Sequence, residues 1–224
     1  MNVRPAIVCV LVLACGTAAF AQKRVELEIG ARGGVPFTVS LDSRLTGAGA
    51  IYSSYAFERS KFSVGPAVTA VVVDRVAIEF GAIYKPIRFR SSFYSPFTIP
   101  IGTTRVSSWE YPLIADYRFR TGPVRPYGGG GMLLGQQLSG TTESQVTDQR
   151  TGTVKTVRGS FRTFFTQLPA YVINGGLEWR TSRLAIRPEM RYTRWSLVSQ
   201  SEEAVRHQNQ FEYLVGISFI AFAR

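Results

Sequence analysis

The sequence predicts an all-β protein, an eight-stranded, up-and-down antiparallel transmembrane β-barrel. Three observations lead to this fold class. Apolar and polar residues alternate in eight segments of roughly ten residues each, the length that a tilted strand needs to cross a bilayer. The connections between these segments are alternately long and short. Charged residues share the faces opposite the apolar residues, so each segment has one face suited to lipid and one suited to a polar interior.

The eight segments are identified by their period of two, which places successive side chains on opposite faces of an extended strand. In the clearest segment, Trp109 to Phe119, the aromatic and aliphatic side chains share one face, and Glu110, Asp116 and Arg118 share the other. The glycine run of the fifth segment hides its phase. The predicted strands cover residues 25–31, 62–70, 76–84, 109–119, 124–137, 171–179, 184–192 and 211–219.

The lengths of the connections favour a membrane barrel over a soluble sandwich. The segments 41–60, 88–106, 138–166 and 196–208 are long, whereas 73–75, 120–123 and 181–183 are short. Up-and-down membrane barrels have tight periplasmic turns at one end and long external loops at the other. We therefore expect both termini at the periplasmic end.

The first residues predict export. Residues 1–21 contain Arg4, an apolar run and then Ala19-Phe20-Ala21, a small-x-small cleavage site. We expect a signal peptide over 1–21 and an outer-membrane β-barrel domain over 22–224. Both cysteines, Cys9 and Cys15, lie in the signal, so cleavage would leave no disulfide or cysteine metal site. The alternative is that Cys15 is the lipidated residue of a lipoprotein.

The charges indicate which face lies inside. Eight acids and eight bases oppose the apolar residues, a set that would be costly to desolvate in a soluble barrel with its aromatic face in water. We therefore expect aromatic girdles outside, ion pairs inside, and inward glycines that make room for long side chains. The sixteen charges are those of Glu26, Glu28, Glu79, Glu110, Asp116, Glu178, Glu189, Glu212, Arg32, Lys61, Lys85, Arg118, Arg120, Arg180, Arg187 and Arg191. Within this set we expect Arg118, Arg187 and Arg191 to pair with Glu79, Glu110, Glu178, Glu189 or Glu212.

Three prolines, Pro66, Pro112 and Pro188, fall within predicted strands. Proline cannot donate to the ladder, and a closed barrel has no free edge where it could be placed. We expect a β-bulge at each.

Several phrases resemble a known family. They are Tyr111-Pro112-Leu113 leading to Asp116-Tyr117-Arg118-Phe119, then Arg125-Pro126-Tyr127, Pro188-Glu189-Met190-Arg191-Tyr192, and Asn209-Gln210-Phe211-Glu212 leading to Gly216-Ile217-Ser218-Phe219. In this order they resemble the bacterial outer-membrane β-barrel domain family, whose members are similar to OmpA-type barrels. The resemblance implies an integral outer-membrane barrel with no catalytic residues. The chain departs from the family pattern because it ends Phe222-Ala223-Arg224 and not on an aromatic residue. We expect this ending to lower the efficiency with which the barrel assembly machinery recognises the chain.

Three other functions have weaker support in the sequence: phosphate binding, lipid hydrolysis and transport. The run Gly128-Gly129-Gly130-Gly131 lacks the Lys-Ser/Thr and helix of a phosphate cradle, and we expect it to pack around inward arginines. His207, the one histidine, lies near Ser199, Ser201, Glu202 and Glu203 and could serve a lipid hydrolase. A small pore or transporter is a further alternative, although eight strands enclose only enough space for side chains.

We therefore expect an outer-membrane protein with a structural or loop-mediated adhesive role and a filled polar core. No enzymatic activity, cofactor or metal is expected. The net charge of +11 is assigned to loops, turns and rims facing anionic membrane surfaces, not to nucleic acid. The expected partners are outer-membrane lipid, lipopolysaccharide and the assembly machinery, with the chain a monomer.

Overall fold

The computed structural model describes residues 26–38, 41–42, 44–48, 51–73, 75–95, 98–119, 122–165, 170–195, 205–206 and 208–223. In these ranges, the regular structure is entirely β-strand. No helix in the described part of the chain is long and apolar enough to cross a membrane.

Eight antiparallel strand positions form a closed barrel, which confirms the predicted fold class. Going round the barrel, each position pairs with the next, and β14 returns to pair with β1. The positions are occupied by β1 (Glu26–Pro36), β5 (Ser63–Val73), β6 (Val76–Gly81) continued by β7 (Ile83–Tyr94), β8 (Thr98–Arg118), β9 (Val124–Asp148), β11 (Ala170–Arg180), β12 (Leu184–Trp195) and β14 (Asn209–Ala223). All eight predicted strands are present.

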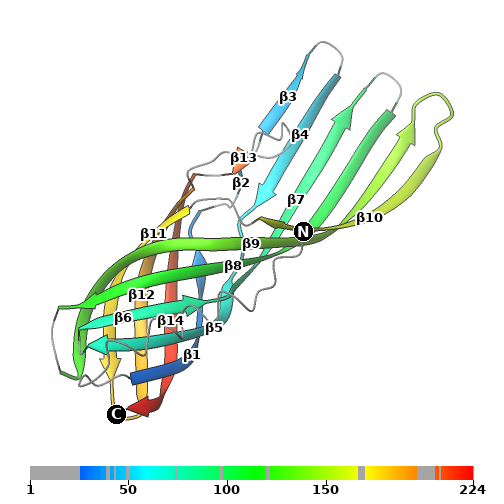
Figure 1. Ribbon diagram of the computed structural model, residues 1–224. Coiled ribbons are helices and arrows are strands. Elements are labelled where there is room, and N and C mark those ends of the chain that lie inside the picture. The colour runs from blue at the N-terminus through cyan, green and yellow to red at the C-terminus, as the bar shows by residue number, and fades with distance from the viewer. Residues whose placement is uncertain are drawn as a thin grey trace, which may run out of the picture.

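The two ends of the barrel differ, as the connection lengths predict. The short turns lie at one end, where Glu26 of β1 pairs with Ala223 of β14, so the two described ends of the chain lie side by side there. At the other end the sheet continues well beyond the barrel as a set of projecting hairpins (Figure 1).

The long connections are more ordered than the sequence indicates, because most of them are strands and not loops. The first contains β2 (Leu41–Asp42), β3 (Arg44–Ala48) and β4 (Ile51–Glu58), and the third is largely β9 paired with β10 (Val154–Phe165). In the second, the pairing of β7 with β8 continues to Ser92 opposite Ile101. Of the fourth, the structure describes β13 (Val205–Arg206), which pairs with β2.

The turn between β9 and β10 is held by its own polar groups. Asp148 donates its backbone N–H to the carbonyl of Thr153 at 3.0 Å and accepts the N–H of Gly152 at 2.8 Å. Gly152 has a φ of 69°, in the left-handed region that favours glycine. The backbone N–H of Arg150 donates to the Asp148 carboxylate at 2.8 Å, and this hydrogen bond lowers the pKa of that carboxyl below its ordinary value.

The outer face of the barrel is apolar, with aromatic side chains at both ends of the apolar band. Phe119, Trp179 and Phe219 at the short-turn end each leave more than 60% of their surface exposed. At the hairpin end, Tyr84 packs against Trp109 with ring centroids 5.3 Å apart, and Tyr192 packs against Phe211 at 4.9 Å. Two girdles around an exposed aliphatic band are typical of a barrel that spans a bilayer.

A bulge is present at one of the three prolines. The pairing of β8 with β9 shifts by one residue between Glu110 and Pro112. At Pro66, the N–H of Ala82 donates to the proline carbonyl at 3.0 Å, but proline has no N–H to return the bond, and the sheet is interrupted there between β6 and β7. At Pro188 the ladder to β11 has a gap but resumes in the same register. The predicted bulges at Pro66 and Pro188 are therefore wrong, because a missing donor is tolerated there as a gap in the ladder.

The glycines mostly serve close approach of neighbouring strands. A Cβ on Gly129 would lie 2.4 Å from the carbonyl oxygen of Ala115 and 2.2 Å from the Asp116 carboxylate. The expectation that the glycine run packs around arginines is wrong, since its inward members face the backbone of β8. The separate expectation that inward glycines make room for long side chains is confirmed at Gly216, where a Cβ would lie 2.9 Å from Nη1 of Arg32. It is wrong at Gly30, where a Cβ would meet the backbone of β14.

Replacing Gly131 tests this close approach. The added Cβ in Gly131→Ala would lie 2.0 Å from the carbonyl oxygen of Leu113 and 2.7 Å from Cα of Ile114, so the two strands would have to separate. We expect a loss of about 1–3 kcal/mol in the free energy of unfolding, measured by urea titration in detergent micelles. The neighbouring Gly130→Ala, whose nearest contact would be Val172 O at 3.4 Å, is the control and should change stability by less than about 0.5 kcal/mol. Equal stability of the two variants would contradict the packing argument.

Candidate functional site: the charged barrel interior

The ten residues predicted for the interior network all lie inside the barrel and are all buried. Each has 5% or less of its surface exposed, and they come from six of the eight strand positions. Alternation along each strand aims them inward, since their neighbours in the sequence face outward. The ten are Glu28, Glu79, Glu110, Asp116, Arg118, Glu178, Arg187, Glu189, Arg191 and Glu212.

The network nearest the short-turn end is centred on two arginines and two glutamates, and Arg180 joins it at 2.8 Å from Glu28. Arg118 lies 2.8 Å from the Glu178 carboxylate and 3.2 Å from Glu28. Arg187 lies 2.8 Å from Glu178 and also donates to Glu28. The four central residues come from β8, β11, β12 and β1, so their ion pairs join strands on different sides of the barrel.

A second set lies deeper along the barrel. Arg191 lies 2.9 Å from Glu189 on its own strand and 3.5 Å from Glu79 on β6. Arg32 of β1 lies between the same two carboxylates, 3.1 Å from Glu189 and in contact with Glu79. The four groups therefore form a closed set of alternating charges across the lumen.

Neutral polar groups complete this second set. Asn174 donates to Asp116 at 2.9 Å and to Glu189 at 3.2 Å. The Tyr127 hydroxyl donates to Glu189 at 3.0 Å. Buried carboxylates need such donors in addition to a counter-charge, because each oxygen has more than one acceptor position.

The third set lies toward the hairpin end and is centred on Lys85. Its ammonium group is 2.6 Å from Glu110 of β8 and 2.7 Å from Glu212 of β14. Gln136 donates to Ser108 at 2.8 Å and to Glu110 at 3.4 Å. Along β8, Ile114 separates this set from Asp116, and it packs in a buried apolar cluster of Ile114, Leu133, Ala170, Val172 and Trp195.

Two polar residues of the barrel interior were not predicted from the sequence, and one residue predicted for the interior lies on the surface. Tyr127 and Gln136 were missed because the glycine run hid the phase of their strand, and a hydrophobic pattern carries no signal for them. Lys61 was expected inside but is exposed, because β5 begins at Ser63 and the alternation does not extend back to Lys61. Arg120 and the group around His207, Ser199, Ser201, Glu202 and Glu203 lie outside the described residues, as do Cys9 and Cys15.

This arrangement can hold strands together and fill the lumen, because its charged side chains contact groups of opposite charge on other strands. The described residues contain no group of three or more His, Cys, Asp or Glu side chains that could hold a metal ion. The interior carboxylates each face an arginine, a lysine or an amide, and are therefore positioned as ion-pair partners.

The chain resembles several solved small barrels in outline. It matches OprG of Pseudomonas aeruginosa with 14% identity and a TM-score of 0.47, over 88% of this chain and 95% of that chain. It matches the N-terminal β-barrel domain of OprF of Pseudomonas aeruginosa with 15% identity and a TM-score of 0.40, over 88% and 97%. For Ail of Yersinia pestis the identity is 10% and the TM-score 0.39, over 88% and 98%.

These structures are small outer-membrane β-barrels, the class that the sequence also resembles. No protein-family model matches the sequence, and a comparison with curated proteins finds no relative. The assignment of the fold rests on the strand pairing of this chain.

Removing Arg191 tests whether the interior pairs hold the barrel together. Arg191→Ala would remove one of the two arginines that contact Glu189 and one of the three that contact Glu79, in a buried setting. We expect a loss of about 3–5 kcal/mol in the free energy of unfolding, measured by urea titration in micelles.

The control is Arg158→Ala. Arg158 lies 3.0 Å from Glu143 in an exposed pair of the β9–β10 hairpin, with 78% of its side chain accessible. This variant should lose less than about 1 kcal/mol. A similar, small loss for both variants would show that the interior pairs contribute no more than surface pairs.

Proposed function

We propose that the chain is an integral outer-membrane β-barrel with a filled, non-conducting core and no catalytic activity, whose projecting hairpins interact with lipid or with other molecules. The observation that carries the proposal is the cross-barrel ion pairing. Arg32, Arg118 and Lys85 each contact carboxylates from two other strands, and such contacts occupy the space through which solutes would pass.

The outer face supports placement in a membrane. Large apolar side chains such as Ile29, Phe80 and Ile173 leave 40% or more of their surface exposed around the barrel. A soluble protein rarely exposes so continuous an apolar surface, whereas a closed barrel satisfies its backbone internally and can present that surface to lipid. The two aromatic girdles delimit the band and set the depth of insertion.

The hairpins support a role in contacts outside the membrane. They extend the sheet well past the girdle at the hairpin end. They expose polar side chains, as in the stretch from Gly140 to Asp148, together with apolar ones such as Val154 and Val157 of β10. Rigid β-hairpins present side chains at fixed positions, which a flexible loop does not. The short turns and both described ends of the chain would then face the periplasm.

Cysteine labelling tests this orientation. The chain after residue 21 contains no cysteine, so Gln149→Cys in the β9–β10 turn and Ser182→Cys in the β11–β12 turn each introduce one reporter. Both positions are exposed. In intact Gram-negative cells, a membrane-impermeant maleimide should label Gln149→Cys and should label Ser182→Cys only after the outer membrane is permeabilised. The parent chain should remain unlabelled, and the reverse pattern would invert the proposed topology.

Planar bilayer recordings test the filled core. Purified full-length protein should insert without discrete conductance steps, because charged side chains fill the lumen across its width. The variant Lys85→Ala/Glu110→Ala removes one ion pair of the set around Lys85. It leaves in place the two sets nearer the short-turn end, so it should also fail to conduct. Regular single-channel steps from the unmodified chain would instead favour the pore alternative.

A further inference from the structure

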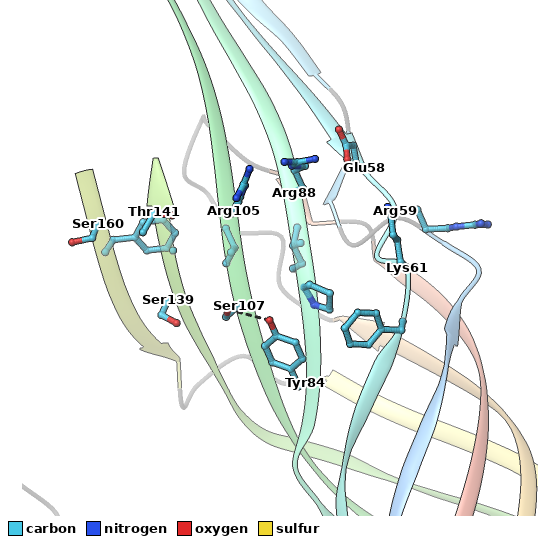
Figure 2. A pocket seen from close by; sticks show the side chains of 16 residues that line it. Glu58, Arg59, Lys61, Tyr84, Arg88, Arg105, Ser107, Ser139, Thr141 and Ser160 are labelled. Atoms are coloured by element: carbon cyan, nitrogen blue, oxygen red, sulfur yellow. Dashed lines mark hydrogen bonds between the residues drawn. The ribbon is translucent and has the colours of Figure 1, made fainter. Parts of the chain in front are cut away.

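Two arginines that have no ion-pair partner in the described part of the chain lie beyond the aromatic girdle of the hairpin end, on the outer face of the sheet. Tyr84 of β7 and Trp109 of β8 are opposite each other, and four residues further along the same strands, toward the hairpins, Arg88 is opposite Arg105. Because side chains alternate along a strand, both pairs share the outer face. In Figure 2, Arg88 and Arg105 lie next to each other beyond Tyr84.

Neither arginine forms an ion pair with a described residue. Glu58 of β4 is opposite Arg88 in the register, but no ion pair joins them within the part of the chain that the structure describes. The hairpins contain one described ion pair, between Arg158 and Glu143. Like charges directly opposite each other on neighbouring strands are destabilising, so these two arginines cost stability unless an anion binds there.

An open groove adjoins the two arginines, with a volume of about 810 Å³. Its apolar lining includes Phe62, Tyr84 and Pro86. Its charged lining adds Arg59 and Lys61 to the two arginines, and Glu58 is the one carboxylate among its described residues. The Tyr84 hydroxyl lies 3.3 Å from the Ser107 hydroxyl, so the polar end of the tyrosine points toward the basic side of the groove (Figure 2).

The apolar side of the groove continues into the surface that faces lipid. Phe62 leaves 45% of its surface exposed, and its ring centroid lies 6.3 Å from that of Tyr84. Tyr84 in turn packs on Trp109. A ligand that fits this surface has an anionic head at the level of the arginines and a hydrocarbon portion along the aromatic side chains.

We propose that Arg88 and Arg105 bind the phosphate of a phosphorylated lipid in the outer leaflet, with its acyl chains lying over Phe62 and the girdle. Arginine suits this role because its planar guanidinium donates two parallel hydrogen bonds to phosphate oxygens. The choice of outer leaflet rests on the proposed function, which places the hairpins outside the cell. The site gives the proposed lipid partner a location on the chain.

The direct test measures the binding of bisphosphorylated lipid A to the purified full chain in detergent, by native mass spectrometry or fluorescence titration. Arg88→Ala/Arg105→Ala should weaken binding by about tenfold or more. The control is Lys155→Ala/Arg158→Ala, which removes the same charge from β10 and should bind as the parent does. Equal affinity of all three proteins would overturn the proposal.

Two further ligands identify the source of the phosphate. Lipid A stripped of both phosphates should bind the parent chain about tenfold or more weakly, and inorganic phosphate should not compete at millimolar concentration. Unchanged binding of the stripped lipid would overturn the role of the arginines, and full competition by inorganic phosphate would show a free-anion site in place of a lipid site. These measurements in detergent do not depend on orientation in the cell, so they can fail while the cysteine labelling succeeds.

Thermal unfolding guards against a variant that merely misfolds. Without lipid, Arg105→Ala should melt at the same temperature as the parent chain or above it, because relief of the like-charge pair offsets the loss of the side chain. With saturating lipid A, the parent should gain more stability than the variant does. A variant that melts lower without lipid and gains as much from lipid as the parent would contradict the proposal.

Discussion

Closure of the sheet is the constraint on which the rest of the structure depends. Because β14 pairs with β1, every barrel strand has a neighbour on both sides and no edge is left to face lipid. Closure also sends alternate side chains into a narrow lumen where water cannot solvate them fully. Charges placed there must therefore neutralise one another, which explains why Arg118 on β8 contacts carboxylates of both β1 and β11.

Arg191 has a special position in that interior. It is directly opposite Glu212, a member of the set around Lys85, but its guanidinium contacts Glu189 and Glu79 in the set below. On the neighbouring strands apolar side chains, including Ile114 and Leu214, separate those two levels. Arg191 therefore starts at the level of Glu212, and its guanidinium extends to the set below, past a layer that contains apolar side chains. The lumen is thus filled by ion pairs at some levels and by apolar packing at another.

The sequence predicted the barrel strands because a period of two survives wherever one face meets lipid and the other a polar lumen. It failed where that contrast disappears. The Ser- and Thr-rich hairpins have water on both faces, so their strands carry no alternation and were expected to be loops, although β9 and β10 pair over their whole overlap. Tyr127 was missed because its neighbours are glycines. The sequence predicted a set of candidate glutamates for the interior arginines but not which glutamate pairs with which arginine. The individual pairs depend on the register between strands, which is shifted by features such as the bulge at Pro112.

The distribution of charge separates two explanations of the basic composition. Among the described residues, the buried interior contains seven acids and five bases, so the excess of positive charge cannot come from there. Part of it lies on the hairpins, where Arg88, Arg90 and Arg105 have no ion-pair partner among the described residues, and part lies in the short turns, where Arg75 and Arg183 are exposed. Arg88 and Arg105 lie four residues beyond Tyr84 and Trp109 of the aromatic girdle. This position agrees with the proposal that they bind a lipid phosphate, because basic side chains near a membrane are attracted to its anionic surface.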